Sequence, residues 1–211
     1  MKKILLFPVL LLTIFSSFGQ DQKVLNDCTV TYDVSVIDAK ADPGVAAAMQ
    51  GATKVVYIRS NKVRTDFITS TFTQTTLQDS KSDSTIILRE FDKNKFISFL
   101  YGNKRKELGK KYEHIRFAKS TDKKVILGYQ CVKTIATLAD GSTYNIFYAP
   151  SIIATNNNFE TQFKDLPGFV LEYEAQTDDG KVRVKYTASK MTLIPVPIAK
   201  FDIPLSGYRV L

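Results

Sequence analysis

The chain has 211 residues, which favours one domain that can bury a core without disulfides or metal ions. Its 29 Lys and Arg and 21 Asp and Glu give a formal net charge of +8, and these charges are mixed along most of the sequence. One histidine and two cysteines argue against a metal centre, because such sites combine several His, Cys or carboxylate ligands at defined spacing.

The N-terminus is typical of a cleaved signal peptide. Two lysines precede an apolar run over residues 4–15, and the small residues Ser17 and Gly19 fit a signal-peptidase site. The run is shorter than the roughly 20 residues that a membrane anchor needs. We expect residues 1–19 to be a signal peptide and residues 20–211 to form one β-rich periplasmic domain, with secretion as the alternative. Export argues against a nucleic-acid partner.

The first half of the mature chain is strand-like. Residues 28–36 alternate apolar and polar side chains, which predicts a strand with one buried face. Residues 42–50 combine Asp-Pro-Gly with an Ala-rich run and predict one short helix. Strand patterns separated by turn signals then continue over residues 53–101, and the charged segment 103–113 predicts a helical turn or a loop.

Two Asp-Gly pairs predict hairpins in the second half. A long strand over residues 126–138 is followed by Asp140-Gly141, and a turn centred there pairs Ile135 with Ile146 and Thr137 with Tyr144. A turn centred on Asp179-Gly180 pairs the residues Tyr173 with Tyr186, Ala175 with Val184, and Glu174 with Lys185.

These patterns predict a mainly β protein. We expect about ten strands in a single antiparallel sheet, curved into a half-barrel or open barrel, with one or two short helices. Pro195, Pro197 and Pro204 end the regular pairing near the C-terminus or confine it to an edge.

The two cysteines of the mature chain, Cys28 and Cys131, lie at apolar positions of their predicted strands. In an oxidising compartment an even pair favours a disulfide, whereas two buried free thiols would give the same pattern. The sequence leaves both alternatives open.

No motif predicts catalysis. His114 lies in a Lys-rich stretch and is expected at the surface, so a nucleophile, base and orienting group are not evident. Glu172 and Glu174 share one strand face, but the predicted hairpin sets Arg183 and Lys185 opposite them, which indicates a surface ion-pair ladder. There is no glycine-rich phosphate loop. We expect a protein that is not an enzyme and needs no cofactor.

Aromatic residues are the most informative side chains. The chain has 14 Phe and 10 Tyr but no Trp. Ordinary core packing is one interpretation, and a curved sheet around an apolar cavity is the other. The candidate cavity residues are Phe67, Phe72, Phe96, Phe99, Tyr101, Phe147 and Tyr148. A basic stretch, Lys104 to Lys111, is a solvated surface or a contact for anionic lipid headgroups or an acidic partner.

Two stretches resemble a known family. Residues 126–133, with Gly128, Tyr129 and Cys131, and residues 165–172, with Leu166, Pro167 and Gly168, are similar to paired motifs of the GLPGLI-type family of small exported proteins of Bacteroidetes-like bacteria. Asp165 stands where the motif has its first Gly, and Phe169-Val170 stands where it has Leu-Ile. The resemblance implies an extracytoplasmic location and a β-rich fold.

A second resemblance covers more of the chain. Residues 55–59, 61–64, 84–88, 92–101 and 201–208 are similar to the strand order and ending of periplasmic lipoprotein carriers with the LolA/LolB-like fold. That resemblance implies an incomplete barrel around a cavity for acyl chains, with helices as a lid and Arg64 near it. Those carriers usually begin with a helix, whereas a strand comes first in this chain.

The leading functional hypothesis is a non-catalytic extracytoplasmic protein that carries or senses lipid, acyl chains or another apolar ligand. The alternative is an envelope structural or protein-interaction module with a filled core, no small ligand and an envelope protein as its partner.

Overall fold

The structure is a computed structural model that describes residues 22–38, 43–156, 160–177, 180, 182–204 and 206–211. The predicted signal peptide lies outside the described residues. In the described part, no helix is long and apolar enough to span a membrane.

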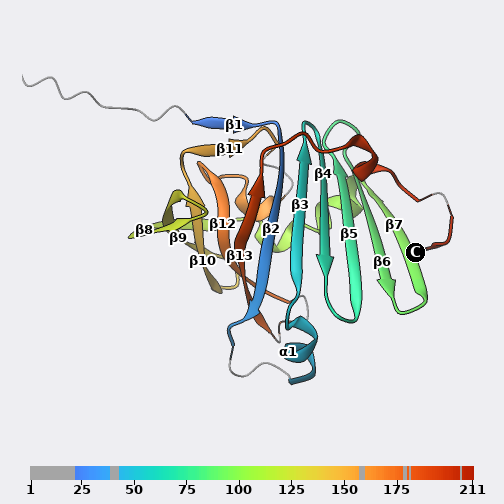
Figure 1. Cartoon of the computed structure of the whole chain (residues 1–211). Helices are drawn as coiled ribbons and strands as arrows, with labels where there is room; N and C mark the ends of the chain where they lie inside the picture. Colours follow the sequence, from blue (N-terminus) through green and yellow to red (C-terminus); the bar gives the residue numbers. More distant parts are fainter. Residues whose placement is uncertain (1–21, 39–42, 157–159, 178–179, 181, 205) are drawn as a thin grey trace, which may run out of the picture.

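One large sheet dominates the molecule (Figure 1). Its twelve strands lie in the order β14 (Arg209–Val210), β7 (Asn94–Tyr101), β6 (Ser84–Phe91), β5 (Phe72–Asp79), β4 (Lys62–Ile68), β3 (Thr53–Arg59), β2 (Asp27–Val36), β13 (Arg183–Thr192), β12 (Phe169–Gln176), β10 (Thr143–Ala149), β9 (Tyr129–Thr137) and β8 (Arg116–Ile126). Strands β1 (Lys23–Leu25) and β11 (Ile152–Ala154) form a separate parallel pair.

The predicted fold class is confirmed in its main features. The protein is mainly β, and no pairing joins the edge strands β8 and β14 within the described residues, so the sheet is open. The prediction of about ten strands in an antiparallel sheet fits only roughly, because the described residues form twelve strands in this sheet and β14 pairs with β7 in parallel. The edge strand β14 has only two residues, which is too short for a recognisable sequence pattern.

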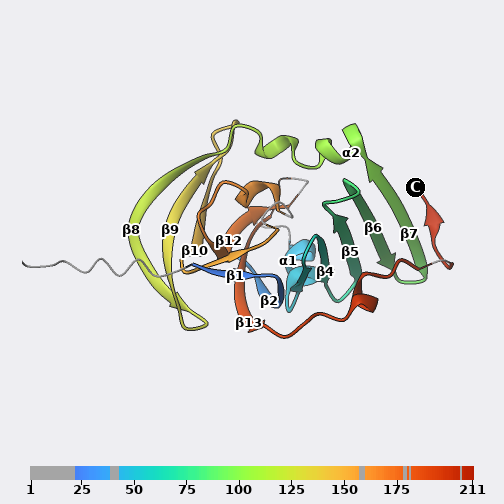
Figure 2. The ribbon, with the colours of Figure 1, turned by 90° about the horizontal axis from the view of Figure 1, so that it is seen from above.

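The curved sheet is bridged on its concave side (Figure 2). The chain leaves β7 near one edge and reaches β8 at the other edge through α2 (Gly102–Glu107) and the 3-10 helix η1 (Lys110–Tyr112). We call residues 102–115 the strap. The predicted helix at residues 42–50 is α1 (Pro43–Met49), and two further 3-10 helices are η3 (Thr161–Phe163) and η4 (Ile198–Phe201).

The predicted register at Asp140-Gly141 needs correction. Thr137 pairs with Thr143 rather than Tyr144, and Asn145 rather than Ile146 lies opposite Ile135. The reason is a three-residue loop in which Gly141 adopts a left-handed φ of 85°, so the turn is one residue longer than a two-residue Asp-Gly turn.

The predicted long strand over residues 126–138 is also wrong. It is divided by a tight turn at Leu127-Gly128, where both residues have positive φ and Ile126 pairs with Tyr129. By contrast, the predicted register at Asp179-Gly180 is confirmed for all three pairs, including Tyr173 opposite Tyr186.

The sheet buries opposite faces in its two halves. We call the face that carries Lys54 and Tyr173 the cavity face and the opposite face the outer face. Around β2, β12 and β13 the core lies on the cavity face, and it includes Val30, Val56 and Tyr173. Around β5, β6 and β7 the core lies on the outer face, where Leu77, Ile86 and Ile97 pack against Val196 and Phe201 of the C-terminal segment. Figure 2 shows this segment on the side of the sheet away from the strap.

The disulfide is not formed. Cys28 and Cys131 are free, buried thiols. Cys28 lies on β2 and Cys131 on β9, and three strands separate these two strands in the sheet. Strand spacing puts them about 19 Å apart along the sheet, beyond the roughly 7 Å between Cα atoms that a disulfide allows. Of the two alternatives that the sequence left open, buried thiols are correct.

Candidate functional site

Two adjacent cavities lie on the concave side of the sheet, beneath the strap. Their volumes are about 440 Å³ and 380 Å³. They share part of their walls, because Tyr112 of the strap, Gln162 of η3, and Tyr173 and Ala175 of β12 line both. We call them the first lobe and the second lobe of one site.

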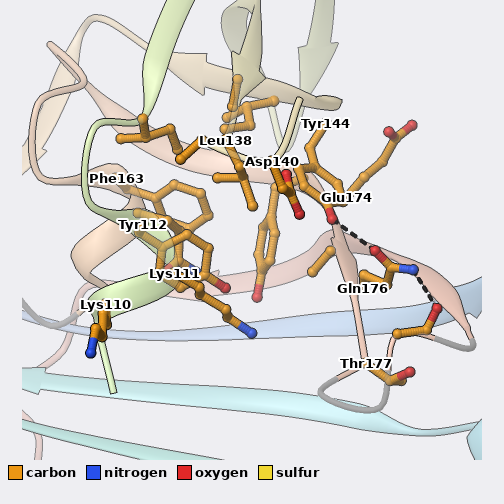
Figure 3. A pocket seen from close by; sticks show the side chains of 18 residues that line it. Lys110, Lys111, Tyr112, Leu138, Asp140, Tyr144, Phe163, Glu174, Gln176 and Thr177 are labelled. Carbon is orange, nitrogen blue, oxygen red and sulfur yellow. Dashed lines mark hydrogen bonds between the residues drawn. The ribbon is translucent and has the colours of Figure 1, made fainter. Parts of the chain in front are cut away.

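The first lobe lies against β9, β10 and β12. Its wall is mostly apolar and includes Leu138, Ile146 and Phe163, while Gln176 brings a polar group to one end (Figure 3). That polar end is held by its own hydrogen bonds. Tyr144 Oη donates to Gln176 Oε1 at 3.1 Å (Figure 3). The Glu174 carboxylate lies on the outer face, where it accepts a hydrogen bond of 2.9 Å from Asn145 Nδ2 and pairs with Arg183. The polar groups of Tyr144 and Gln176 are therefore paired with each other, and the rest of the first lobe is mostly apolar.

The second lobe lies against β3, β4, β5 and β13. Aromatic rings form much of its wall: Phe67 and Phe72 have centroids 5.7 Å apart, and Phe67 lies 6.3 Å from Tyr186. Tyr186 in turn stacks on Tyr173 at 4.5 Å with an interplanar angle of 9°. Because the cross-strand pair Tyr173 and Tyr186 spans β12 and β13, it carries the aromatic surface toward the first lobe.

Lys54 is the unusual residue of this wall. It carries a charge, yet its side chain is only 10% exposed, because it lies on the same face of β3 as the core residues Val56 and Ile58. Its Nζ donates to Tyr173 Oη at 2.7 Å and lies 5.1 Å from the Tyr173 ring centroid. The rings of Tyr32 and Tyr186 are also within 6 Å of Nζ, which is the range of a cation–π contact.

The counter-charge of Lys54 comes from a different segment. The Glu160 carboxylate forms an ion pair with Lys54, and its other oxygen accepts a hydrogen bond of 2.8 Å from Gln162 Nε2. Glu160 directly precedes η3 and lies outside the sheet. Burial, reinforced by the Glu160 charge, raises the pKa of Tyr173 and of Tyr32 well above the usual range, so both phenols stay neutral. The buried charges of this cluster are therefore one ammonium and one carboxylate.

The mouth of the site is basic. Lys110 and Lys111 of η1 are exposed, and both line the first lobe. In the predicted basic stretch, Arg105 forms an ion pair with Asp83, and Lys104 and Lys106 are exposed on α2. The stretch thus belongs to the strap over the cavity.

Only two of the predicted cavity residues line the cavity. Phe67 and Phe72 line the second lobe. Phe96 is also on the cavity face, opposite Arg89, but it lines neither lobe. Phe99 and Tyr101 lie on the outer face, in register with Ile86 and Ser84.

The remaining predicted residues also lie away from the cavity. Phe147 lies on β10 opposite Glu172, with Lys124 Nζ 4.0 Å from its ring centroid, and Tyr148 packs near Gly168. Arg64 is on the outer face, where it pairs with Asp66 and donates to the Lys200 carbonyl of η4, so it is far from the strap.

The residues of the family motif lie in a turn or in the core and not at the cavity. Gly128 forms the β8–β9 turn, beside Tyr129, and Cys131 and Leu166 are buried in the core. The backbone of Gly168 does not have a positive φ. Its lack of a side chain matters for packing instead, because a Cβ there would lie 2.5 Å from the carbonyl oxygen of Ala149.

Sequence analysis missed Lys54, Glu160 and Gln162. A usable signal existed for Lys54, which takes the place of an apolar residue in the alternation Lys54, Val56, Ile58. His114 is exposed and lines neither lobe. Among the described residues, no group of three or more His, Cys, Asp or Glu side chains is placed to hold a metal ion.

Comparison with known proteins adds little. No protein-family model matches the chain, and no curated protein matches it. The GLPGLI-type resemblance therefore rests on the quoted motifs alone. Two structures of PNGF-II, in C2 and P21 crystal forms, each show 13% identity and a TM-score of 0.47, and they cover 87% and 88% of this chain.

A crystal structure of MucB shows 8% identity and a TM-score of 0.38 over 85% of this chain. The chain spans 30% and 31% of the two PNGF-II chains and 58% of the MucB chain. These similarities are too weak to carry an argument about function.

Proposed function

We propose that this protein is a non-catalytic, extracytoplasmic binding protein that holds an apolar ligand, with an acyl chain as the leading candidate. The observation that carries the proposal is the two-lobed cavity with aromatic and aliphatic walls on the concave side of the sheet. The periplasmic location rests on the signal-peptide pattern of residues 1–19.

The size and chemistry of the site support an elongated apolar ligand. Each lobe falls within the roughly 300–1,000 Å³ typical of small-molecule pockets. The two lobes meet at Tyr112 and Tyr173, so one chain could extend through both. The driving force is burial, at roughly 25 cal/mol per Å² of apolar surface. The exposed lysines of the strap suit peripheral contact with an anionic membrane during exchange of the ligand.

The direct test is to purify the full-length exported protein from cells, extract it with organic solvent, and search the extract for acyl chains by mass spectrometry. The delipidated protein is then titrated with a neutral fluorescent probe, N-phenyl-1-naphthylamine. We expect retained acyl chains and saturable probe binding. An extract without apolar ligand, together with no saturable binding, contradicts the proposal.

A matched pair of variants tests where the probe binds. Ala175 lines both lobes, so Ala175→Trp fills the space where they meet and is expected to abolish probe binding. Ala199 is exposed on η4, on the other side of the sheet, and Ala199→Trp is expected to bind as the unchanged protein does. Equal binding by both variants would show that the probe lies elsewhere.

One observation favours the alternative, an interaction module of the cell envelope. Leu193, Ile194, Ile198 and Ile203 of the C-terminal segment are exposed aliphatic residues, and Ile194 is 66% exposed. Exposed apolar residues that form a contiguous patch mark contacts with a partner. An empty cavity in the extraction experiment, followed by crosslinking of this segment to one envelope protein in cells, would select this alternative.

A further inference from the structure

The ion pair at the cavity wall has features of a built anion site. Lys54 lies on a strand of the sheet, and its Nζ is fixed by Tyr173 Oη at 2.7 Å. Three tyrosine rings surround it, and its side chain has little contact with solvent. A buried ammonium is costly without a counter-charge, so this position requires an anion.

The anion that meets this requirement is not part of the sheet. Glu160 is separated from Lys54 by 106 positions in the sequence and lies between β11 and β12, in the connection that contains η3. Lys54 and the neighbouring Gln162 both line the second lobe, so an anion at this position would face the cavity. The cation thus belongs to a strand of the sheet, whereas the carboxylate belongs to a connecting segment.

We propose that Lys54 is the head-group site for a long-chain carboxylate and that the Glu160 carboxylate occupies this site when no ligand is bound. This inference rests on the proposed function, because it names the ligand class of the same cavity. The ligand carboxylate takes the place of Glu160 on Lys54 Nζ, and the alkyl chain extends past Tyr173 into the first lobe. A carboxylate is favoured because the group that holds the site in the free protein is itself a carboxylate.

Two consequences distinguish this site from the basic mouth. The protein prefers a fatty acid to the fatty alcohol of equal length, because only the acid can replace the Glu160 carboxylate as the counter-charge of Lys54. Removing the charge of Glu160 raises affinity for the acid, because the ligand no longer competes with an internal carboxylate. Lys111 provides the control, since it also carries one positive charge and lines both lobes but lies on the exposed strap.

The experiment measures displacement of N-phenyl-1-naphthylamine from the delipidated protein by hexadecanoate and by hexadecanol. For the unchanged protein we expect hexadecanoate to bind at least about tenfold more tightly, as one charge-assisted hydrogen bond predicts. Glu160→Gln is expected to raise affinity for hexadecanoate and to leave hexadecanol unchanged. Lys111→Met is expected to keep the preference for the acid.

Lys54→Met alone would leave Glu160 partly buried without its partner, so the double variant Lys54→Met/Glu160→Gln is used. It is expected to bind both compounds with equal affinity. Hexadecyl phosphate is a further probe, and a stronger preference for it than for hexadecanoate would show that the head group is a phosphate.

The outcomes separate the two proposals. If hexadecanoate and hexadecanol bind equally to the unchanged protein, or if Lys111→Met rather than the double variant removes the preference, Lys54 is not the head-group site and the cavity still binds apolar chains. Failure of Glu160→Gln to strengthen binding of hexadecanoate also overturns the inference. If neither compound displaces the probe from any variant, the proposed function itself fails.

Discussion

The two halves of the sheet differ in which face they bury. Near β2, β12 and β13 the core is on the cavity face, and near β5, β6 and β7 it is on the outer face, beneath the C-terminal segment. In the second of these halves the cavity face carries side chains such as Gln74 and Arg89, which hydrogen-bond to each other at 2.9 Å.

This difference explains why a cavity can exist in a close-packed protein. The half formed by β5, β6 and β7 obtains its stability from the outer face, so its cavity face need not be filled by core side chains. The second lobe lies where the two arrangements meet, between Tyr186 of β13 and Phe72 of β5. The comparison predicts that the two cores stabilise the protein separately and that only one of them affects the ligand.

The largest effect is expected in the core of the cavity face. Leu171 is fully buried, so Leu171→Ala should lower the free energy of unfolding by about 3–5 kcal/mol, measured by urea denaturation. Leu193→Ala, at a position 39% exposed, is the control and should change it by less than about 0.5 kcal/mol. Similar small losses for both variants would contradict the placement of this core.

Phe201 tests the core of the outer face. Phe201→Ala removes a buried ring that packs against Leu77 and Ile97, and it should cost about 3 kcal/mol of unfolding free energy. The folded variant should still bind N-phenyl-1-naphthylamine with unchanged affinity, because the cavity lies on the opposite face. Loss of probe binding in a folded variant would show that the two halves are not independent.

A smaller effect is expected at the glycine of the family motif. Gly168→Ala places a Cβ within 2.5 Å of a backbone oxygen of Ala149, and such overpacking costs about 1–3 kcal/mol. The control is Gly109→Ala, whose Cβ would meet only the side chain of Thr161, at 3.0 Å, which can move. Thermal denaturation of both variants measures the difference, and an equal loss of stability would reject close approach as the role of Gly168.

The smallest effect is a pH dependence at the outer face. The Glu90 carboxylate accepts a hydrogen bond from Tyr208 and lies 2.9 Å from Lys95 Nζ, and these contacts lower the Glu90 pKa below its usual value of 4.5. Because the folded-state pKa is the lower one, this contribution to stability is complete above pH 4.5 and is lost as the pH falls through the lowered pKa.

The comparison of Glu90→Gln with the unchanged protein measures this contribution. We expect the unchanged protein to be the more stable of the two at neutral pH and the difference to shrink under acid conditions. A difference that stays constant from neutral to acid pH would mean that Glu90 does not hold the C-terminal segment through its charge.

The sequence predicted those features that depend on local chemistry. The register at Asp179-Gly180 followed from a turn signal with consistent cross-strand pairs, and two of the aromatic candidates, Phe67 and Phe72, located part of the cavity wall. The turn at Leu127-Gly128 could not be predicted from Leu127, since a leucine with φ of 51° has no local turn preference.

The site was less predictable because it joins distant segments. Phe99 and Phe67 both lie in strand-like sequence, but only Phe67 faces the cavity. The face that each strand buries depends on where the C-terminal segment packs. The pairing of Lys54 with Glu160 arises only when the connection between β11 and β12 folds back over β3 and β13. The local periodicity of the sequence does not indicate where this connection packs.

The most direct test of the account is nuclear magnetic resonance of the tyrosine rings during titration with hexadecanoate. Tyr173 and Tyr186 line the second lobe, whereas Tyr57 and Tyr208 pack on the outer face. We predict that the ring signals of Tyr173 and Tyr186 shift in a saturable manner and that those of Tyr57 and Tyr208 do not. Shifts confined to Tyr57 and Tyr208, or no saturable shift at any of the four, would contradict a ligand site on the concave face.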